Sequence, residues 1–372
     1  MQVFLYGTLL DDVLRARLLG REIATRAATA QGYAVRRQAE DIYPALVADP
    51  AATATGIVIG GLTETEIARL DSYELPFGYK ADVISVIVDG APAQARAYVP
   101  DGTVPVSDEP WDMQPWRDHV APVQREMARE IGAYDPPLSG KSLKRQWHMI
   151  ALRAGVRVRA AASVTPSEVR RSAAPGDVVV QTRKPLAGEF FKFAAFEMDH
   201  STFRGDRSGT LPREVILAAD AAIVLPYDPA TDHLLLVEQI RVGPLLRGEP
   251  NPWLLEPVAG MIDGLETPEQ AALREVAEET GLSNVTLEKM FAFYPSPGAS
   301  TDYFNCYLAL ADLPEATTYT GGLVDESEDL RLHVLPFDRA LALIDTGEVN
   351  VGPLIAMLYW LDRQRPRLRA AA

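Results

Sequence analysis

The residues of this sequence best suited to chemistry are three glutamates, Glu275, Glu278 and Glu279. Their spacing places all three carboxylates on one face of a predicted helix. Carboxylates this close repel one another unless cations lie between them. Magnesium is a hard cation that binds a few protein carboxylates together with phosphate oxygens. The pattern therefore predicts a site that presents Mg²⁺, with Mn²⁺ as a substitute, to a pyrophosphate.

The ends of this helix can also be read from the sequence. Thr267, Pro268 and Glu269 form a helix start, with a capping hydroxyl, a proline in the first turn and an acid near the helix N-terminus. Gly281 is the expected C-terminal stop. An acidic solvated helix is the simpler alternative for the three glutamates.

That alternative does not explain the full pattern, which runs G-x5-E-x7-R-E-V-x-E-E-x-G-L from Gly260 to Leu282. The segment resembles the box of the Nudix hydrolases at every defined position. The resemblance implies Glu275 and Glu279 as principal metal ligands, with help from Glu278. It further implies that Arg274 orients the carboxylates, that the Ala259 carbonyl contacts the metal, and that Glu266 supports the packing of loop on helix.

The flanks of the box resemble the ADP-ribose pyrophosphatase branch, through Glu238–Arg241, Trp253–Gly260 and Ser296–Gly298. The resemblance implies a nucleoside diphosphate substrate, with Arg241 on the diphosphate and Arg213 on the nucleotide. An arginine fork suits phosphate oxygens, although a surface ion pair is the simpler alternative for both. Pro297 stands near the branch's diagnostic proline. Asp302 is a departure, because the branch often has a longer glutamate there.

A general base outside the box is expected, because metal-bound glutamates are poor bases. The acidic segment Gly321–Arg331 resembles the mobile loop of the same branch, with Glu326 as the base and Glu328 as an auxiliary ligand. An exposed acidic turn is the alternative. The implied reaction is attack of water on phosphorus, giving AMP and ribose 5-phosphate from ADP-ribose. The branch also implies a domain-swapped homodimer, with the segment 186–220 supplying the swap.

A second constellation lies near the N-terminus. Phe4–Leu9, followed by Leu70–Tyr79, resembles the gamma-glutamylcyclotransferase-like family. The resemblance implies that a substrate carboxylate binds backbone N–H groups of the turn, formed by Tyr6, Gly7, Thr8 and Leu9. It implies Glu74 as the general acid and base. Lys80 departs from the family pattern, which often has arginine. Two alternatives remain open: the N-terminal domain is a non-catalytic binding or sensor module, and the Nudix domain acts on another nucleoside-diphosphate derivative.

The whole chain resembles proteins associated with tellurite resistance, which indicates no mechanism. Its 372 residues favour more than one domain. We expect a gamma-glutamylcyclotransferase-like domain over 1–105, a helical linker region over 106–185 and a Nudix domain over 186–372. The expected fold class is α/β and α+β: a mixed β-barrel with helices, then an α/β/α sandwich.

The chain that must position these residues has the composition of a soluble globular protein. The net charge of −15 argues against general binding of nucleic acid. The apolar runs are too short to span a membrane, and a single cysteine, Cys306, gives no sign of an oxidising compartment. The cytoplasm is the expected location.

One stretch, Pro137–Ala162, contains no acidic residue and six lysines and arginines. We expect it to pack against an acidic face of its own chain or of a partner, or to be solvated; binding of anionic ligands or a membrane surface is the alternative. A single helix is expected over Arg117–Gly132.

Overall fold

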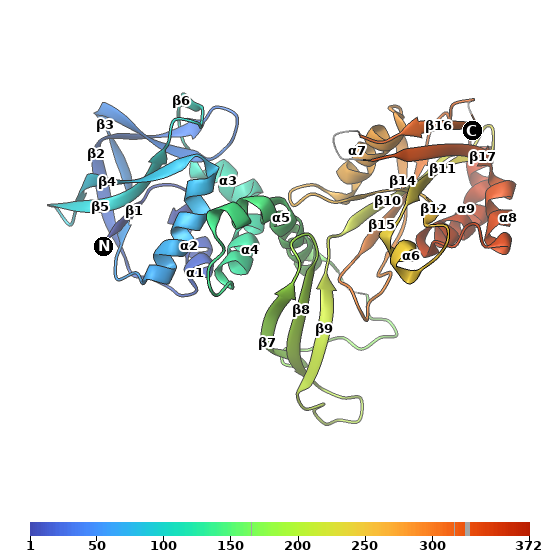
Figure 1. The fold of residues 1–372 in the computed structure, drawn as a ribbon, viewed down its shortest axis with the longest axis horizontal. Helices are drawn as coiled ribbons and strands as arrows, with labels where there is room; N and C mark the ends of the chain where they lie inside the picture. Colours follow the sequence, from blue (N-terminus) through green and yellow to red (C-terminus); the bar gives the residue numbers. More distant parts are fainter. Residues whose placement is uncertain (165, 316, 324–327) are drawn as a thin grey trace. The chain divides into compact units, whose positions relative to one another are not determined.

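The computed structural model describes residues 1–164, 166–315, 317–323 and 328–372. The chain forms two compact units, Met1–Pro166 and Ser167–Ala372 (Figure 1). The helices within the expected linker region, 106–185, belong to the first unit. The strand that begins in this region at Val178 pairs with a strand of the second unit.

A closed β-barrel forms one half of the first unit. The strands follow the order β3-β1-β5-β4-β2, and β2 pairs again with β3, which closes the ring; β6 extends it beside β2. Small and apolar side chains alternate into the interior, among them Phe4, Ala30 and Val86, as expected for strands with a period of two. The strands are β1 (Val3–Leu5), β2 (Thr25–Gln38), β3 (Pro44–Ile59), β4 (Tyr79–Val88), β5 (Ala91–Pro100) and β6 (Val106–Pro110).

Helices cover one side of this barrel and enclose a second core around Leu14, Leu70, Trp116 and Ile150. A capping box between Thr63 and Glu66 starts α2. The helices are α1 (Asp12–Leu19), α2 (Glu64–Glu74), α3 (Met113–His119), α4 (Ala121–Gly132) and α5 (Gly140–Ala162), with short 3₁₀ turns η1 (Thr8–Leu10) and η2 (Leu75–Phe77).

The expected helix Arg117–Gly132 is instead the end of α3 followed by α4. Pro122 lies in the first turn of α4. Proline has no backbone N–H to donate and its ring clashes with the preceding turn, so a continuous helix is disfavoured and a new helix starts there.

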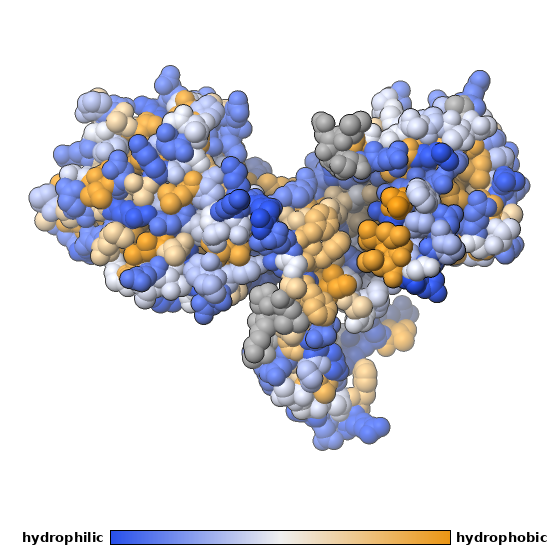
Figure 2. All heavy atoms as spheres, viewed as in Figure 1, coloured by the Kyte–Doolittle hydropathy of each residue, from blue (hydrophilic) through white to orange (hydrophobic). Residues whose placement is uncertain are grey.

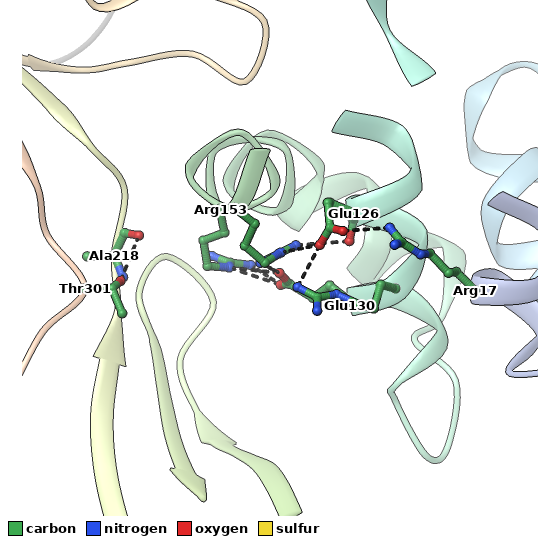
Figure 3. Close-up of polar contacts among 8 residues, drawn as sticks. Arg17, Glu126, Glu130, Arg153, Ala218 and Thr301 are labelled. Carbon is green, nitrogen blue, oxygen red and sulfur yellow. Dashed lines mark hydrogen bonds and ion pairs between the residues drawn. The ribbon is translucent and has the colours of Figure 1, made fainter. Parts of the chain in front are cut away.

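The basic stretch forms most of α5 and packs against acidic residues of its own chain. Arg153 is 2% exposed and donates to Glu130 at 2.6 Å, while Arg157 pairs with Glu126 at 2.9 Å (Figure 3). Arg17 of α1 also pairs with Glu126. These ion pairs, of which Arg153 is the buried member, link α1, α4 and α5. The expectation that this stretch packs against an acidic face of its own chain is therefore confirmed for Arg153 and Arg157.

The second unit contains a mixed sheet between helices. Its strands follow the order β14-β15-β10-β11-β17-β16, with β12 beside β11 and β13 beside β10. One face packs against α8 and α9 through Leu225, Leu308 and Met357. The other face packs against α7 through Val224, Val276 and Leu332. The bounds are β10 (Ala221–Asp228), β11 (His233–Ile240), α6 (Val242–Arg247), β12 (Trp253–Glu256), β13 (Val258–Met261), α7 (Pro268–Thr280), β14 (Thr286–Phe293), β15 (Phe304–Leu310), β16 (Thr318–Gly321), β17 (Leu330–Pro336), α8 (Phe337–Thr346) and α9 (Gly352–Ala370).

A small antiparallel sheet precedes this sandwich: β7 (Val178–Ala187), β8 (Lys192–His200) and β9 (Leu211–Leu217). The end of β9 is attached to the loop before β15. Ile216 bridges Ser300, and the Ala218 amide donates to Thr301 Oγ1 at 2.9 Å (Figure 3).

These two units confirm the predicted fold class, a barrel with helices and an α/β/α sandwich. Among the described residues, no helix has the length and apolar character needed to cross a membrane.

Candidate functional site

The predicted carboxylate cluster lies on α7 against β13. Thr267 and Gln270 form a capping box, Pro268 occupies the first turn, and Gly281 ends the helix with φ +74°. Residues on the opposite side of α7, such as Val276, are fully buried in the sheet. The sequence thus fixes the helix ends and its rotation, and with them the direction of the glutamates.

Arg274 organises the cluster. Its guanidinium donates to Glu275 at 2.7 Å, to Glu278 at 3.0 Å and to Glu266 at 2.9 Å. It also donates to the Met261 carbonyl. The hydrogen bonds to Glu266, then the charges of the glutamates, raise the pKa of Arg274. The residue therefore stays charged and connects the helix to the loop before it.

Glu275 and Glu279 are buried, 8% and 2% exposed. Burial raises the pKa of Glu275 to about 7, opposed by Arg274 and assisted by Glu278 and Glu328. Burial also raises the pKa of Glu279 to about 8, with Glu275 and Glu328 adding to the effect. These acidic side chains therefore lie close enough to disfavour one another's ionisation.

Two observations bear on a metal at this cluster. Glu279 Oε2 is buried without a hydrogen-bond partner, a state that buried polar atoms seldom adopt. Its other oxygen accepts weakly from the Ala259 amide at 3.4 Å. A Cβ at Gly260 would lie 1.8 Å from the Glu275 carboxyl, so only glycine leaves room there. The residues fit a cation that binds oxygen.

As the side chains stand, however, Arg274 occupies Glu275 and Glu278. Within the ranges that the structure describes, no three His, Cys, Asp or Glu side chains are already grouped to hold a metal ion. A cation would have to compete with Arg274 for these oxygens.

The first unit contains a cavity of about 340 Å³ that combines the predicted N-terminal residues. Tyr6, Gly7, Thr8 and Leu9 lie on one side and Glu74 on another. Gly7 is required by close packing, because a Cβ there would lie 2.3 Å from Pro44 Cγ. The turn and the proposed base therefore share one pocket.

Glu74 is half-buried at the end of α2, and burial raises its pKa to about 7. Its carboxylate makes no hydrogen bond or ion pair with the residues that the structure describes. Hydroxyl groups nearby are used elsewhere: Tyr6 donates to the Tyr98 carbonyl, and Tyr79 donates to the Pro44 carbonyl at 2.6 Å. The Glu74 carboxyl therefore lines the cavity without a partner among the described residues.

Comparisons with known proteins agree with this geometry. Residues 217–356 match the family model of the NUDIX domain. The ADP-ribose pyrophosphatase of Escherichia coli (strain K12) is 35% identical over 195 residues, which span 52% of this chain and 91% of that protein. The chain belongs to the Nudix family. Its C-terminal half is a Nudix hydrolase.

Other relatives agree with the Nudix assignment. The ADP-ribose pyrophosphatase of Haemophilus influenzae is 32% identical over 195 residues, 52% of this chain and 89% of that protein. The GDP-mannose pyrophosphatase of Enterobacter sp. (strain 638) is 33% identical over 150 residues, 40% of this chain and 77% of that protein. Residues 3–118 match the family model described as gamma-glutamyl cyclotransferase, AIG2-like, which confirms the second predicted resemblance.

Around the Nudix box, the structure brings some predicted residues together. Arg241 pairs with Glu256 at 2.7 Å and lowers the pKa of Glu279, so it faces the cluster. Glu328 accepts from the Leu323 amide at 3.3 Å and also faces the cluster. Glu326 lies outside the described residues.

Three other predicted residues make no hydrogen bond or ion pair with the described residues of the box. Arg213 is exposed on β9 and donates to the Pro212 carbonyl at 2.8 Å; no hydrogen bond or ion pair joins it to the described box residues. Pro297 is exposed in the turn after β14. Asp302 accepts from Ser300 Oγ at 2.6 Å in the same loop.

Sequence reasoning missed several residues of both sites. Glu256, the partner of Arg241, lies within the segment Trp253–Gly260 that resembles the ADP-ribose pyrophosphatase branch. Its burial beside an arginine is visible only in the structure. Gln124 and Trp147 line the N-terminal cavity from α4 and α5. Both belong to the stretch that we expected to be a linker, so no sequence signal connected them to the pocket.

We predict that Glu74→Gln changes how stability depends on pH. With a folded pKa of about 7 against an ordinary value of 4.5, the folded state holds a proton that the unfolded state has lost. The free energy of unfolding of the natural protein therefore falls as pH rises through this window. The relative stability of Glu74→Gln should grow by up to about 3 kcal/mol from pH 4.5 to 8, measured by urea unfolding.

The matched control is Glu22→Gln, an exposed glutamate of the same unit. Its unfolding free energy should follow that of the natural protein at every pH. Parallel pH profiles for Glu74→Gln and the natural protein would contradict the burial of this carboxyl.

Proposed function

We propose that the Nudix domain hydrolyses ADP-ribose, or a related ADP-sugar, to AMP and ribose 5-phosphate with Mg²⁺. One observation carries the proposal: a buried carboxylate cluster facing Arg241, in a chain whose relatives include ADP-ribose pyrophosphatases. Arg241 offers a guanidinium fork beside the cluster, which suits the diphosphate. Mn²⁺ would substitute for Mg²⁺, because both accept carboxylate oxygens.

The proposed metal ligands are Glu275, Glu278 and Glu279, with the Ala259 carbonyl and Glu328. When bound, the cation supplies Lewis acidity and neutralises the charge that develops on the phosphate oxygens. Glu275 and Glu279 hold protons near neutral pH in the free cluster, so binding must release them. With a cation bound, Arg274 would release Glu275 and Glu278 and keep its hydrogen bond to Glu266, which holds the loop in place.

The proposed general base is Glu326, outside the box, which would take the proton from the attacking water. Arg213 would bind the nucleotide, and Asp302 and Pro297 would line the substrate site from the loop before β15. Asp302 is held by Ser300. Its short side chain reaches less far than the glutamate found in the related branch.

A hydrolysis panel with Mg²⁺ tests this assignment. We expect ADP-ribose to turn over faster than GDP-mannose or a nucleoside triphosphate. Glu279→Gln should lower the hydrolysis rate by at least about 10³-fold, because it removes a buried charge that the cation requires.

Glu269→Gln is the control for that variant, since Glu269 lies on the same helix, is exposed, and accepts from the Tyr307 hydroxyl at 2.9 Å. It should keep the full rate. Turnover of another nucleotide with ADP-ribose untouched would reject the substrate assignment, and normal activity of Glu279→Gln would reject the metal site.

We also propose that the Nudix unit forms a homodimer through the β7–β9 sheet. This sheet exposes apolar side chains that a monomer would leave in water: Val178, Val179, Val180, Phe190, Phe191, Phe193 and Ile216. Figure 2 shows apolar side chains on the visible face of this part of the unit. Arg213 is exposed on the same sheet, which supports its delivery to the site of a second subunit.

Phe193→Asp should therefore convert the protein to a monomer, because it places a charge on the proposed apolar interface. The mass should be measured by light scattering, and ADP-ribose hydrolysis should fall in parallel. Tyr359→Asp, at an exposed aromatic residue of α9, should change neither. A natural protein that is monomeric at micromolar concentration would contradict this proposal.

A second function is supported by the cavity of the first unit, where Glu74 and the Gly7 turn meet. We propose a gamma-glutamyl cyclotransferase reaction. The substrate carboxylate binds the backbone N–H groups of the turn, and Glu74 takes a proton from the α-amine. The α-nitrogen bonds to the γ-carbonyl carbon, the bond from that carbon to the amine breaks, and the departing amine receives the proton. The products are 5-oxoproline and the free amine.

We expect the full chain to release 5-oxoproline from gamma-glutamyl compounds, and Glu74→Gln to lower that rate by at least about 10²-fold. Hydrolysis of ADP-ribose by this variant should be unchanged. Release from no donor would favour the alternative, in which the first unit is a binding module.

A further inference from the structure

The N-terminal cavity is completed by helices that lie beyond the matched family region. The matched segment ends at residue 118. Gln124 on α4 and Trp147 on α5 nevertheless line the cavity together with the turn and Glu74. The pocket therefore contains a wall that the rest of the barrel does not supply.

Aromatic side chains form this wall. The Trp147 ring lies 4.5 Å from Phe77 and 5.9 Å from Tyr73 between ring centroids, at tilted angles of 53° and 58°. Tyr73 is buried, whereas Trp147 and Phe77 are partly exposed. We call these three residues the aromatic wall. Tilted aromatic faces of this kind hold a further aromatic or bulky apolar group well.

The polar group that α4 contributes to the cavity, the Gln124 side-chain amide, already makes two hydrogen bonds within the protein. Gln124 accepts from Trp116 Nε1 at 2.6 Å and donates to the Tyr43 hydroxyl at 2.7 Å. With both ends of the amide used, Gln124 fixes Tyr43 and the cavity edge.

The charge of the cavity lining also restricts which ligands the cavity can bind. The lining residues that carry charge are Glu74 and Asp41, and no Lys, Arg or His is among the described residues that line it. Backbone N–H groups of the turn would serve the α-carboxylate of a gamma-glutamyl group. A second carboxylate, on the departing amine, would find no cation and would face two acids.

We propose that the aromatic wall sets the substrate class of this pocket: gamma-glutamyl conjugates of aromatic or bulky apolar amines without a carboxylate, with Trp147 as the specificity-determining residue. This inference rests on the proposed cyclotransferase function. The wall would hold the amine portion, while the turn and Glu74 hold the gamma-glutamyl portion.

The test compares three compounds with the full-length protein: gamma-glutamyl phenethylamide, gamma-glutamyl ethylamide and gamma-glutamyl phenylalanine. We expect kcat/KM for 5-oxoproline release to be about 10-fold or more higher for the phenethylamide than for either of the others. Equal values for the phenethylamide and the ethylamide would overturn the inference, as would a preference for gamma-glutamyl phenylalanine.

Substitutions at the wall give a sharper measurement. Trp147→Ala should raise KM for the phenethylamide about 10-fold or more and leave kcat and the ethylamide KM within about twofold, because the lost contact lies on the amine portion. Trp147→Phe should restore most of the preference and shows that the helix still folds. Lys144→Ala, an exposed neighbour on α5 outside the lining, should behave as the natural protein. Equal losses of kcat for all compounds in Trp147→Ala and Trp147→Phe would mean that Trp147 has a structural role only, and would overturn the inference.

Failure of the cyclotransferase reaction would be recognised separately. If no compound releases 5-oxoproline, the same three are titrated by calorimetry. Tighter binding of the phenethylamide that is lost in Trp147→Ala would support the aromatic wall as a recognition surface. Only the proposed cyclotransferase reaction would then be rejected. Equal binding of all three would reject the wall.

Discussion

The ion pairs of Arg274 are the interaction on which the Nudix site depends. Glu275, Glu278 and Glu266 all accept from this one guanidinium, and without it the acids on α7 would repel one another beside a buried sheet. The guanidinium also ties α7 to the loop through the Met261 carbonyl. Helix rotation, loop position and charge balance are thus determined together. A cation that binds Glu275 or Glu278 must therefore replace part of this network.

The N-terminal pocket uses burial in a different way. No lysine, arginine or histidine is among the described residues that line this pocket, and burial raises the pKa of Glu74 to about 7. In the Nudix cluster Arg274 opposes that effect at Glu275, whereas the described lining of the pocket contains several tyrosines and one further acid, Asp41. Under the two proposed functions, the units use buried glutamates differently: those on α7 would bind a cation, and Glu74 would move a proton.

Much of the Nudix site could be predicted from the sequence because its residues are local. Glu275, Glu278 and Glu279 belong to one helix whose cap and stop residues are explicit, so spacing alone gave their common face. The role of Arg274 came from the resemblance to the Nudix box. Arg213 could not be placed by such reasoning, since its position depends on a separate sheet. The long strands β2 and β3 gave little signal, because small residues such as Ala30 and Ala54 fill the barrel where larger apolar residues would mark a strand. Trp147 was missed for a topological reason: a helix read as a linker folds back onto the barrel, and local pattern carries no record of that contact.

The attachment of β9 has a mechanical consequence. Ile216 bridges Ser300, and the Ala218 amide donates to Thr301, while Asp302 is the next residue along. Arg213 is three residues before Ile216, about 10 Å along the strand at the usual rise. The small sheet is therefore attached to the loop before β15 at the end of β9, and Arg213 lies farther along the same strand. Any tilt of the sheet would therefore move Arg213 relative to Asp302, and the hydrogen bonds that join Ile216 and Ala218 to the loop limit that movement.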